Sequence, residues 1–195
     1  SGGEVIINEQ FTEKELEKRA GEKNIHRLHL ATHGEFIPGK PEESKLYLSN
    51  GSINMNKLRE LRVSRSDWPL ELLSLSACRT ALGDTDNELG LAGLALLAGA
   101  QSAIGTLWYV DDIAASIFFI RFYHWLEKGL PKAEAVQQVR FEFIHNKYQL
   151  KNSKLISPEG NILIDNLTIK NQIQLREGLD HPYFWAAPVL IGKPW

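Results

Sequence analysis

Three short apolar runs, separated by longer segments that each contain a predicted helix, constrain the fold of this chain more than any other feature. The runs are residues 25–31, 70–76 and 102–108. The second and third are apolar on both faces, which is typical of strands in a parallel sheet covered by helices. Strands that alternate with helices also favour parallel pairing through crossover connections. The sequence therefore predicts an α/β domain with a mainly parallel sheet flanked by helices, in which residues 188–192 supply the last strand.

Helix start signals mark several segments around these strands. Thr12 and Glu15 form a capping-box pattern at the start of a helix. Asp112 stands at a capping position before an amphipathic segment over residues 113–127. A further segment, residues 131–148, opens with proline, which is favoured in the first turn of a helix. We expect all three segments to be helices of the α/β domain.

The stretch from residue 149 to residue 180 differs in composition from its surroundings. It is polar and β-rich, and residues 158–161 read as a turn between two short apolar runs. We interpret it as a hairpin insertion in a domain that spans residues 4–195. Residues 1–3, Ser-Gly-Gly, have no apolar core behind them and look like a vector-derived leader, so they are left out of the fold prediction.

Composition and charge exclude several classes of protein. A chain of 195 residues suffices for one domain, and a net charge of −2 with scattered Lys and Arg gives no electrostatic basis for binding nucleic acid. The single Cys cannot form an internal disulfide, which indicates a reducing, cytoplasmic location and leaves the thiol available for chemistry. The most apolar stretch, residues 89–108, is interrupted by Gln101, Ser102, Thr106 and several Gly, so no membrane span is predicted.

Reactive side chains follow two of the predicted strands. Residues 32–34, Thr-His-Gly, come after the first, and residues 77–79, Ala-Cys-Arg, come after the second. Ligands of open α/β sheets bind beyond the carboxyl ends of the strands, so both groups lie at one edge if the two strands are neighbours. The imidazole of His33 can then take the proton of the Cys78 thiol and return it to a leaving amine. Gly34, which lacks a side chain, can bring its N–H to an oxyanion, with the N–H of Cys78 as the second donor.

Each of these residues alone also has an ordinary structural explanation. Free Cys is among the most buried residue types, and a lone His on a strand is usually a satisfied core or surface residue. The combination favours chemistry, because His33 and Cys78 are 78 − 33 = 45 residues apart, which leaves room for one crossover. A metal site is not predicted, since His29 and His33 would stand about 13 Å apart on one strand and no HExxH motif is present. No cofactor is predicted either, because the chain has neither a GxGxxG nor a Walker-type run.

Four motifs in this order resemble the CHAT family, which is similar to caspases and separases. They are residues 30–36 (LATHGEF), residues 75–80 (LSACRT) with Leu82-Gly83, Leu107-Trp108 with Val110 and Asp112, and residues 181–186 (HPYFWA). The resemblance covers residues 4–195 apart from the polar insertion. It implies a caspase-like fold, a three-layer sandwich, and a catalytic dyad formed by Cys78 and His33.

The resemblance also implies an activity and a context. Members of the family act as cysteine endopeptidases through an acyl-enzyme, and the domain commonly follows tetratricopeptide repeats at the C-terminal end of a longer chain. By that pattern this chain is the catalytic portion of a domain that begins further upstream. The expected partners are a protein substrate and either the repeat region or a regulatory protein that switches the peptidase on.

Specificity is predicted from Asp112. Separases are similar around the Leu-Trp segment, where an acidic residue matching Asp112 recognises a basic side chain before the cleaved bond, and a carboxylate would pair with Arg or Lys. The alternative role of Asp112 is to cap the following helix. Metacaspases carry an acidic residue two positions before the nucleophile, where this chain has Ser76, and this departure shifts weight to Asp112. Asp111 and Glu35 are further acidic candidates, and Trp108 is a candidate pocket wall.

Two other functions stay open. One is a non-catalytic module that keeps the caspase-like fold and acts by binding a protein, although intact His33 and Cys78 argue against it. The other is a thiol hydrolase or acyltransferase that acts on a small molecule, for which the sequence offers no cofactor-binding loop.

Overall fold

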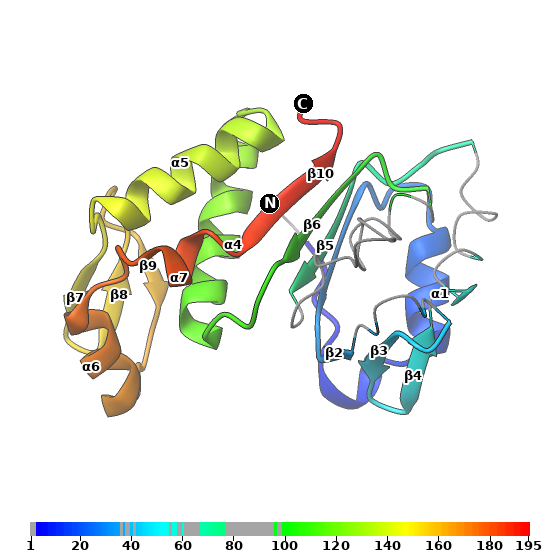
Figure 1. Ribbon diagram of the computed structural model, residues 1–195, viewed down its shortest axis with the longest axis horizontal. Helices are drawn as coiled ribbons and strands as arrows, with labels where there is room; N and C mark the ends of the chain where they lie inside the picture. Colours follow the sequence, from blue (N-terminus) through cyan, green and yellow to red (C-terminus); the bar gives the residue numbers. More distant parts are fainter. Residues whose placement is uncertain are drawn as a thin grey trace. The chain divides into compact units, whose positions relative to one another are not determined.

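The computed structural model describes residues 3–35, 37, 40, 42–54, 56, 57, 60, 67–76, 96 and 99–195. The chain divides into two compact units (Figure 1). The first contains residues 1–109 and 188–194, and the second contains residues 110–187 and 195.

A four-stranded sheet in the order β1-β5-β6-β10 forms the centre of the first unit. Its strands are β1 (Arg27–Ala31), β5 (Leu72–Ser76), β6 (Ser102–Thr106) and β10 (Pro188–Gly192). The first three are parallel, and β10 runs antiparallel to β6. The predicted fold class, α/β with a mainly parallel sheet, is confirmed and is consistent with a caspase-like fold.

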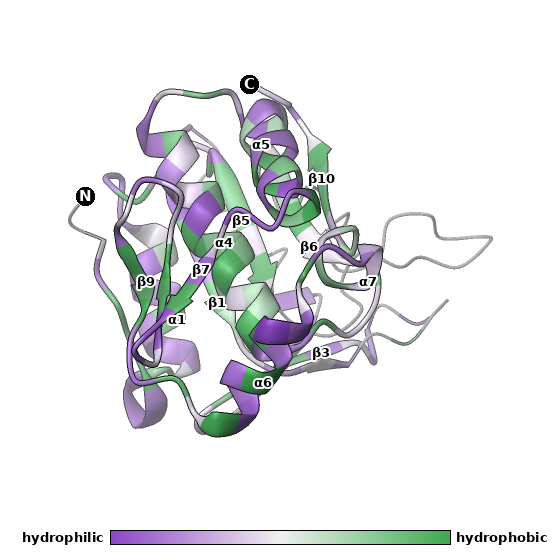
Figure 2. Ribbon diagram, turned by 90° about the vertical axis from the view of Figure 1, so that its left-hand side faces the viewer, coloured by the Kyte–Doolittle hydropathy of each residue, from purple (hydrophilic) through white to green (hydrophobic). Residues whose placement is uncertain are grey.

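The two middle strands of this sheet are buried. All five residues of β6 are buried, and so are four of the five in β5. Ser102 tolerates this environment because its hydroxyl donates a 2.7 Å hydrogen bond to the carbonyl of Glu71. β10 is apolar along its length (Figure 2) and ends at Gly192, where φ is +95° and a Cβ would lie 2.5 Å from the carbonyl oxygen of Gln101. Only glycine fits this close approach to the start of β6.

Helix α1 (Glu13–Gly21) adds its apolar face to the core of the same unit. It follows a short 3-10 helix, η1 (Asn8–Gln10), and its cap Thr12 accepts a 3.3 Å hydrogen bond from the N–H of Glu15. This half of the predicted capping box is confirmed. The second half is not, because the carboxylate of Glu15 accepts a 2.7 Å hydrogen bond from Arg19 instead of reaching back to the cap. Leu16 on the inner face of α1 belongs to the same hydrophobic cluster as Leu30 of β1.

A second, antiparallel sheet follows β1 in the chain. It consists of β2 (Gly34–Glu35), β3 (Lys45–Leu48) and β4 (Gly51–Asn54). Of these strands, the sequence predicts only β3. Leu46 on β3 and Ile53 on β4 lie opposite each other, and both are buried in the core of the first unit. This pair anchors the hairpin to the rest of the unit.

The second unit combines four helices with a small sheet. Its helices are α4 (Asp112–Glu127), α5 (Lys132–Ile144), α6 (Ile169–Glu177) and α7 (Pro182–Trp185). Its strands are β7 (Gln149–Lys151), β8 (Lys154–Ile156) and β9 (Ile162–Ile164), in an antiparallel order β7-β8-β9. In its core, Phe118 of α4 packs against Phe122 of the same helix and against Phe143 of α5. In the part of the chain that the structure describes, no helix is long and apolar enough to cross a membrane.

The polar stretch at residues 149–180 contains the predicted hairpin and two elements that the sequence does not predict. The turn at residues 158–161 joins β8 to β9 and is closed by a 2.8 Å hydrogen bond from the N–H of Ser157 to the carbonyl of Asn161. The additional elements are β7 and helix α6. Thr168 caps α6 by accepting a 3.2 Å hydrogen bond from the N–H of Asn171.

A buried ion-pair network ties this hairpin to α4 within the second unit. Arg121 is 1% exposed and donates two 2.7 Å hydrogen bonds to Glu142, which is 2% exposed. It also donates to both carboxylate oxygens of Glu159, in the hairpin turn, at 2.9 and 2.7 Å. Trp125 and Tyr148 each donate a further hydrogen bond to Glu142. The carboxylate of Glu142 therefore accepts four hydrogen bonds in a buried site.

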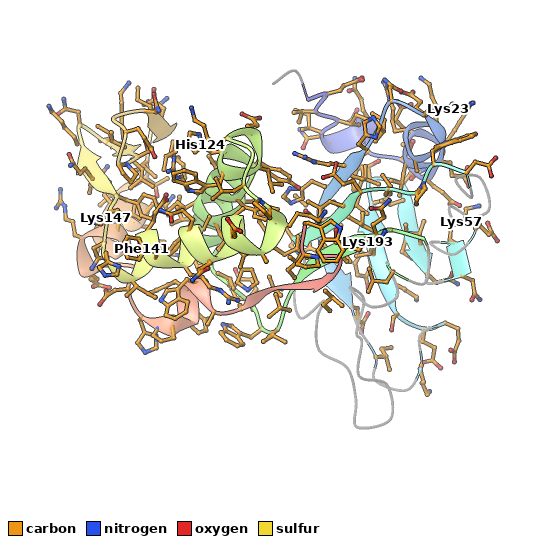
Figure 3. The ribbon with its side chains drawn as sticks, turned by 90° about the horizontal axis from the view of Figure 1, so that it is seen from above. Lys23, Lys57, His124, Phe141, Lys147 and Lys193 are labelled. Atoms are coloured by element: carbon orange, nitrogen blue, oxygen red, sulfur yellow. The ribbon has the colours of Figure 1, made fainter. Side chains whose placement is uncertain are left out.

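The hydrogen bonds of this network determine the direction in which the pKa of Glu159 is shifted. Partial burial would raise the pKa of Glu159, but hydrogen bonds from Arg121 and from Ser157 outweigh it and lower that pKa to about 2. His124 of α4 (Figure 3), three residues after Arg121 in the sequence, has its Nε2 3.9 Å from Oε1 of Glu159. A lone Arg in the apolar run FFIRF is the sequence signal for this network, because a charged residue in apolar surroundings needs partners.

Candidate active site

The register of the central sheet brings the ends of β1 and β5 together. The two strands are parallel neighbours, and their last paired residues are Ala31 and Ser76. His33 follows Ala31 by two positions, and Cys78 follows Ser76 by two positions in the sequence. The condition on which the predicted dyad depends, that the two strands are adjacent, is therefore met. Cys78 itself lies in the stretch from residue 77 to residue 95, outside the described residues, so its pairing with His33 stays a prediction.

His33 lies at a corner between the two sheets of the first unit. β1 ends at Ala31 and β2 begins at Gly34, so that only Thr32 and His33 connect them. The side chain of His33 is exposed, and its carbonyl accepts a 2.9 Å hydrogen bond from the N–H of Tyr47 on β3. The hydroxyl of Thr32 donates to the carbonyl of the same tyrosine.

The pairing of β2 with β3 sets the direction of the backbone N–H of Gly34. Gly34 lies opposite Leu46, between the positions of His33 and Glu35. In an antiparallel ladder the residues alternate between those that bond to the partner strand and those whose N–H and C=O point to the other edge. Because the carbonyl of His33 bonds to β3, the N–H of Gly34 is directed away from that strand. This is the N–H that the sequence predicts as an oxyanion donor.

Glu35 is exposed at the end of β2. Its carboxylate accepts a 3.0 Å hydrogen bond from the hydroxyl of Tyr47, and this bond raises the pKa of the tyrosine above its ordinary value. One oxygen of this candidate substrate-binding carboxylate is therefore already engaged. Ser76, two positions before the predicted nucleophile, is half-buried at the end of β5, and Trp108 is half-buried just after β6.

The structure corrects the prediction that Asp112 caps the long helix. Asp111 is the cap, because its Oδ1 accepts hydrogen bonds from the N–H groups of Ile113 at 2.9 Å and Ala114 at 3.4 Å. Asp112 is the first residue of α4 and is exposed in the first turn, where the helix dipole favours a negative charge. Two adjacent aspartates can both cap a helix, and the sequence does not tell which one takes the extended backbone that a cap requires. Capping thus occupies the carboxylate of Asp111 and leaves that of Asp112 to solvent.

His29 stands in the middle of β1, opposite Ser74 of β5. Burial disfavours its charged form and lowers its pKa to about 4, so the imidazole is neutral at pH 7. Among the described residues, no group of three or more His, Cys, Asp and Glu side chains is arranged to hold a metal ion.

Because the half-buried imidazole of His29 has a lowered pKa, the protein is expected to lose stability in mild acid. The unfolded chain binds a proton at His29 near pH 6.5, whereas the folded chain does so only near pH 4, so stability should fall as the pH drops through this window. His29→Leu cannot gain this charge and should lose about 2–3 kcal/mol less than the wild type between pH 7 and pH 4. Urea unfolding at half-unit pH steps measures the difference. Parallel stability curves for the two proteins would contradict the prediction.

A family model described as CHAT domain matches residues 1–193. The chain belongs to the CHAT family. This family is associated with caspase-like cysteine peptidases, and the match in this CHAT domain runs through residues 149–180 as well as through the four motifs. No curated protein matches the chain.

The site residue that sequence reasoning missed is Tyr47. It contacts the segment that carries His33 through its N–H, its carbonyl and its hydroxyl. The alternation of Lys45, Leu46, Tyr47 and Leu48 predicts a strand, but nothing in it indicates which segment pairs with that strand.

Proposed function

We propose that this CHAT domain is a cysteine endopeptidase in which Cys78 is the nucleophile and His33 is the general base. The observation that carries the proposal is the register of β1 and β5, whose last paired residues each stand two positions before one of the two reactive residues. Adjacent parallel strands deliver the residues beyond their carboxyl ends to the same edge of the sheet. The association of the family with caspase-like cysteine peptidases supports the same proposal.

The proposed reaction has two stages. His33 takes the proton of the Cys78 thiol, and the thiolate attacks the carbonyl carbon of the scissile peptide bond. The N–H groups of Gly34 and Cys78 stabilise the negative charge that develops on the carbonyl oxygen. The imidazolium gives its proton to the leaving amine, which departs and leaves a thioester. Water, deprotonated by His33, then hydrolyses this acyl-enzyme and regenerates the thiol.

We propose further that the peptidase cleaves a protein partner after Arg or Lys and that Asp112 selects the basic side chain. Support comes from its exposed carboxylate, which is not used for capping, whereas that of Asp111 is. A carboxylate that keeps its charge pairs strongly with a guanidinium once water is excluded. Activation by a tetratricopeptide-repeat region or another regulatory protein, in a reducing cytoplasmic compartment, completes the proposal.

Alkylation and peptide turnover together test the proposed activity. Because Cys78 is the only cysteine, mass gain after treatment with iodoacetamide reports on this residue alone. We expect Cys78 to be alkylated, peptides that end in Arg or Lys to be cut, and matched peptides that end in Asp to be left intact. Asp112→Asn should weaken the preference for basic peptides, while Asp165→Asn, an exposed carboxylate in the 149–180 stretch, should not.

The opposite outcome would favour an interaction module. If Cys78 resists alkylation and no peptide is cut even when candidate partners are added, the proposed activity is wrong. A Cys78→Ala variant that keeps the full biological effect of the protein would then identify binding, rather than cleavage, as the function.

A further inference from the structure

Tyr47 contacts the segment around His33 at three points. Its N–H donates a 2.9 Å hydrogen bond to the carbonyl of His33, and its own carbonyl accepts from the hydroxyl of Thr32. Its hydroxyl donates at 3.0 Å to the carboxylate of Glu35. One tyrosine therefore holds the residue before His33, His33 itself and a residue after it.

The strand that carries Tyr47 is rigidly supported. Leu46, its neighbour on β3, is fully buried in the hydrophobic cluster of the first unit. On the other side of β3, Tyr47 lies opposite Ser52 of β4, within a ladder of four residue pairs. The position of Tyr47 is thus set by the core and by the hairpin, independently of the segment that it holds.

The corner at Thr32 and His33 needs such support. Neither residue is part of a strand, since β1 ends before them and β2 begins after them. In the described structure the hydroxyl of Thr32 and the carbonyl of His33 connect this corner to β3, both through Tyr47. A general base must lie within hydrogen-bond reach of the proton that it removes, so the backbone that bears it must be fixed.

We infer that Thr32 and Tyr47 are positioning residues that fix the backbone of His33 and thereby the position from which its imidazole acts as the general base. The inference rests on the proposed peptidase function for its kinetic consequence, but the positioning itself is a property of the folded protein. The hydrogen bond from the Thr32 hydroxyl can be removed without changing the shape of the side chain, because valine is isosteric with threonine.

Thr32→Val should lower kcat about 10-fold to 100-fold and leave KM unchanged, since Thr32 holds the base and does not bind substrate. Thr32→Ser keeps the hydroxyl and should restore most of the rate. Tyr47→Phe removes only the bond to Glu35 and keeps both backbone contacts, so its effect should be smaller than that of Thr32→Val.

Thr12→Val is the matched control. It makes the same change in the same unit and also deletes one hydroxyl hydrogen bond, the helix cap to Glu15, but that bond is made to the first turn of α1 and not to the corner at Thr32 and His33. If Thr32→Val acts only by destabilising the fold, Thr12→Val will reduce kcat to a similar extent at a similar unfolding midpoint. That result, or a wild-type kcat in Thr32→Val, would overturn the inference.

A measurement without substrate separates this inference from the proposed function. In protein labelled with ¹³C and ¹⁵N at histidine, the His33 ring signals are assigned with a His33→Gln variant and compared among the variants. We expect Thr32→Val to shift or broaden the His33 signals, and Thr32→Ser and Thr12→Val to leave them near their wild-type positions. Unchanged His33 signals in Thr32→Val would overturn the positioning role, whether or not peptides are cut. Cys78→Ala addresses the dyad instead: if it leaves the His33 ring signals unchanged and the wild type cuts no peptide, the peptidase proposal fails, while the positioning role is still decided by Thr32→Val.

Discussion

Replacing Arg121 with Met is expected to lower the free energy of unfolding by about 3–5 kcal/mol, because it leaves the carboxylate of Glu142 buried without its counter-ion. Glu142 is 2% exposed, so solvent cannot take the place of the guanidinium. The hydrogen bonds from Trp125 and Tyr148 remain, but they carry no compensating charge. Urea unfolding followed by circular dichroism measures the change from the shift of the midpoint at constant slope.

The double variant Arg121→Met/Glu142→Leu distinguishes a buried charge from a general packing defect. A buried ion pair can often be replaced by apolar residues of similar volume with little loss, whereas removal of one partner is costly. We therefore expect the double variant to recover most of the stability that the single variant loses. Lys154→Met serves as a control in the same unit, since its ion pair with Asp165 is 38% and 47% exposed and should contribute less than about 1 kcal/mol. Additive losses in the double variant would contradict this account.

The network also bears on how the 149–180 stretch can be studied. Glu159 lies in the β8–β9 turn and accepts two hydrogen bonds from Arg121. Exchanging the whole stretch for a short linker would remove this partner, and a loss of activity could then follow from instability alone. Exposed residues of the stretch, such as Ile169 and Ile173 of α6, are better targets, because they can be changed while Glu159 stays in place.

The sequence predicts the central sheet well because its strands carry their own signal. Apolar runs of strand length between helical segments are sufficient to predict β5 and β6, because runs this short suit strands that are buried on both faces better than helices. Elements with few buried apolar residues are not predicted, because they carry little of this signal. Helix α6 has no buried residue, and β4 has one, so their formation depends on caps and partner strands rather than on periodicity.

The candidate site likewise has features that the sequence predicts and features that it does not. The strand ends that carry His33 and Cys78 are predictable from sequence, because the polarity of parallel strands determines which residues reach the edge of the sheet. The contacts of Tyr47 are not, since they depend on a pairing register that a two-residue strand such as β2 does not specify. The sequence predicts Asp112 as the cap of α4, one residue after the cap that the structure shows, Asp111. The two neighbouring aspartates have the same side chain, so the sequence does not distinguish them.

Replacing His33 with Ala is expected to reduce kcat for peptide hydrolysis by about 10²–10⁴-fold, which is the usual contribution of a positioned general base. The same variant should change the chemistry of Cys78 in the absence of substrate. A thiol beside an imidazole ionises more readily than a free thiol, whose pKa is about 8.5. Alkylation of Cys78 should therefore continue below about pH 7 in the wild type and should decline below about pH 8.5 in His33→Ala.

His26→Ala is the matched control for this experiment. His26 is also exposed, but it stands just before β1, at the opposite end of the strand from His33. Its removal should leave both kcat and the pH profile of alkylation at wild-type values. Because alkylation needs neither a substrate nor an activating partner, the pH profile reports on the dyad even in a protein that cuts no test peptide. A pH profile of alkylation that is the same in the wild type and in His33→Ala would show that His33 and Cys78 do not form a dyad. The register of β1 and β5 would then bring two segments to the same edge of the sheet without a shared chemistry.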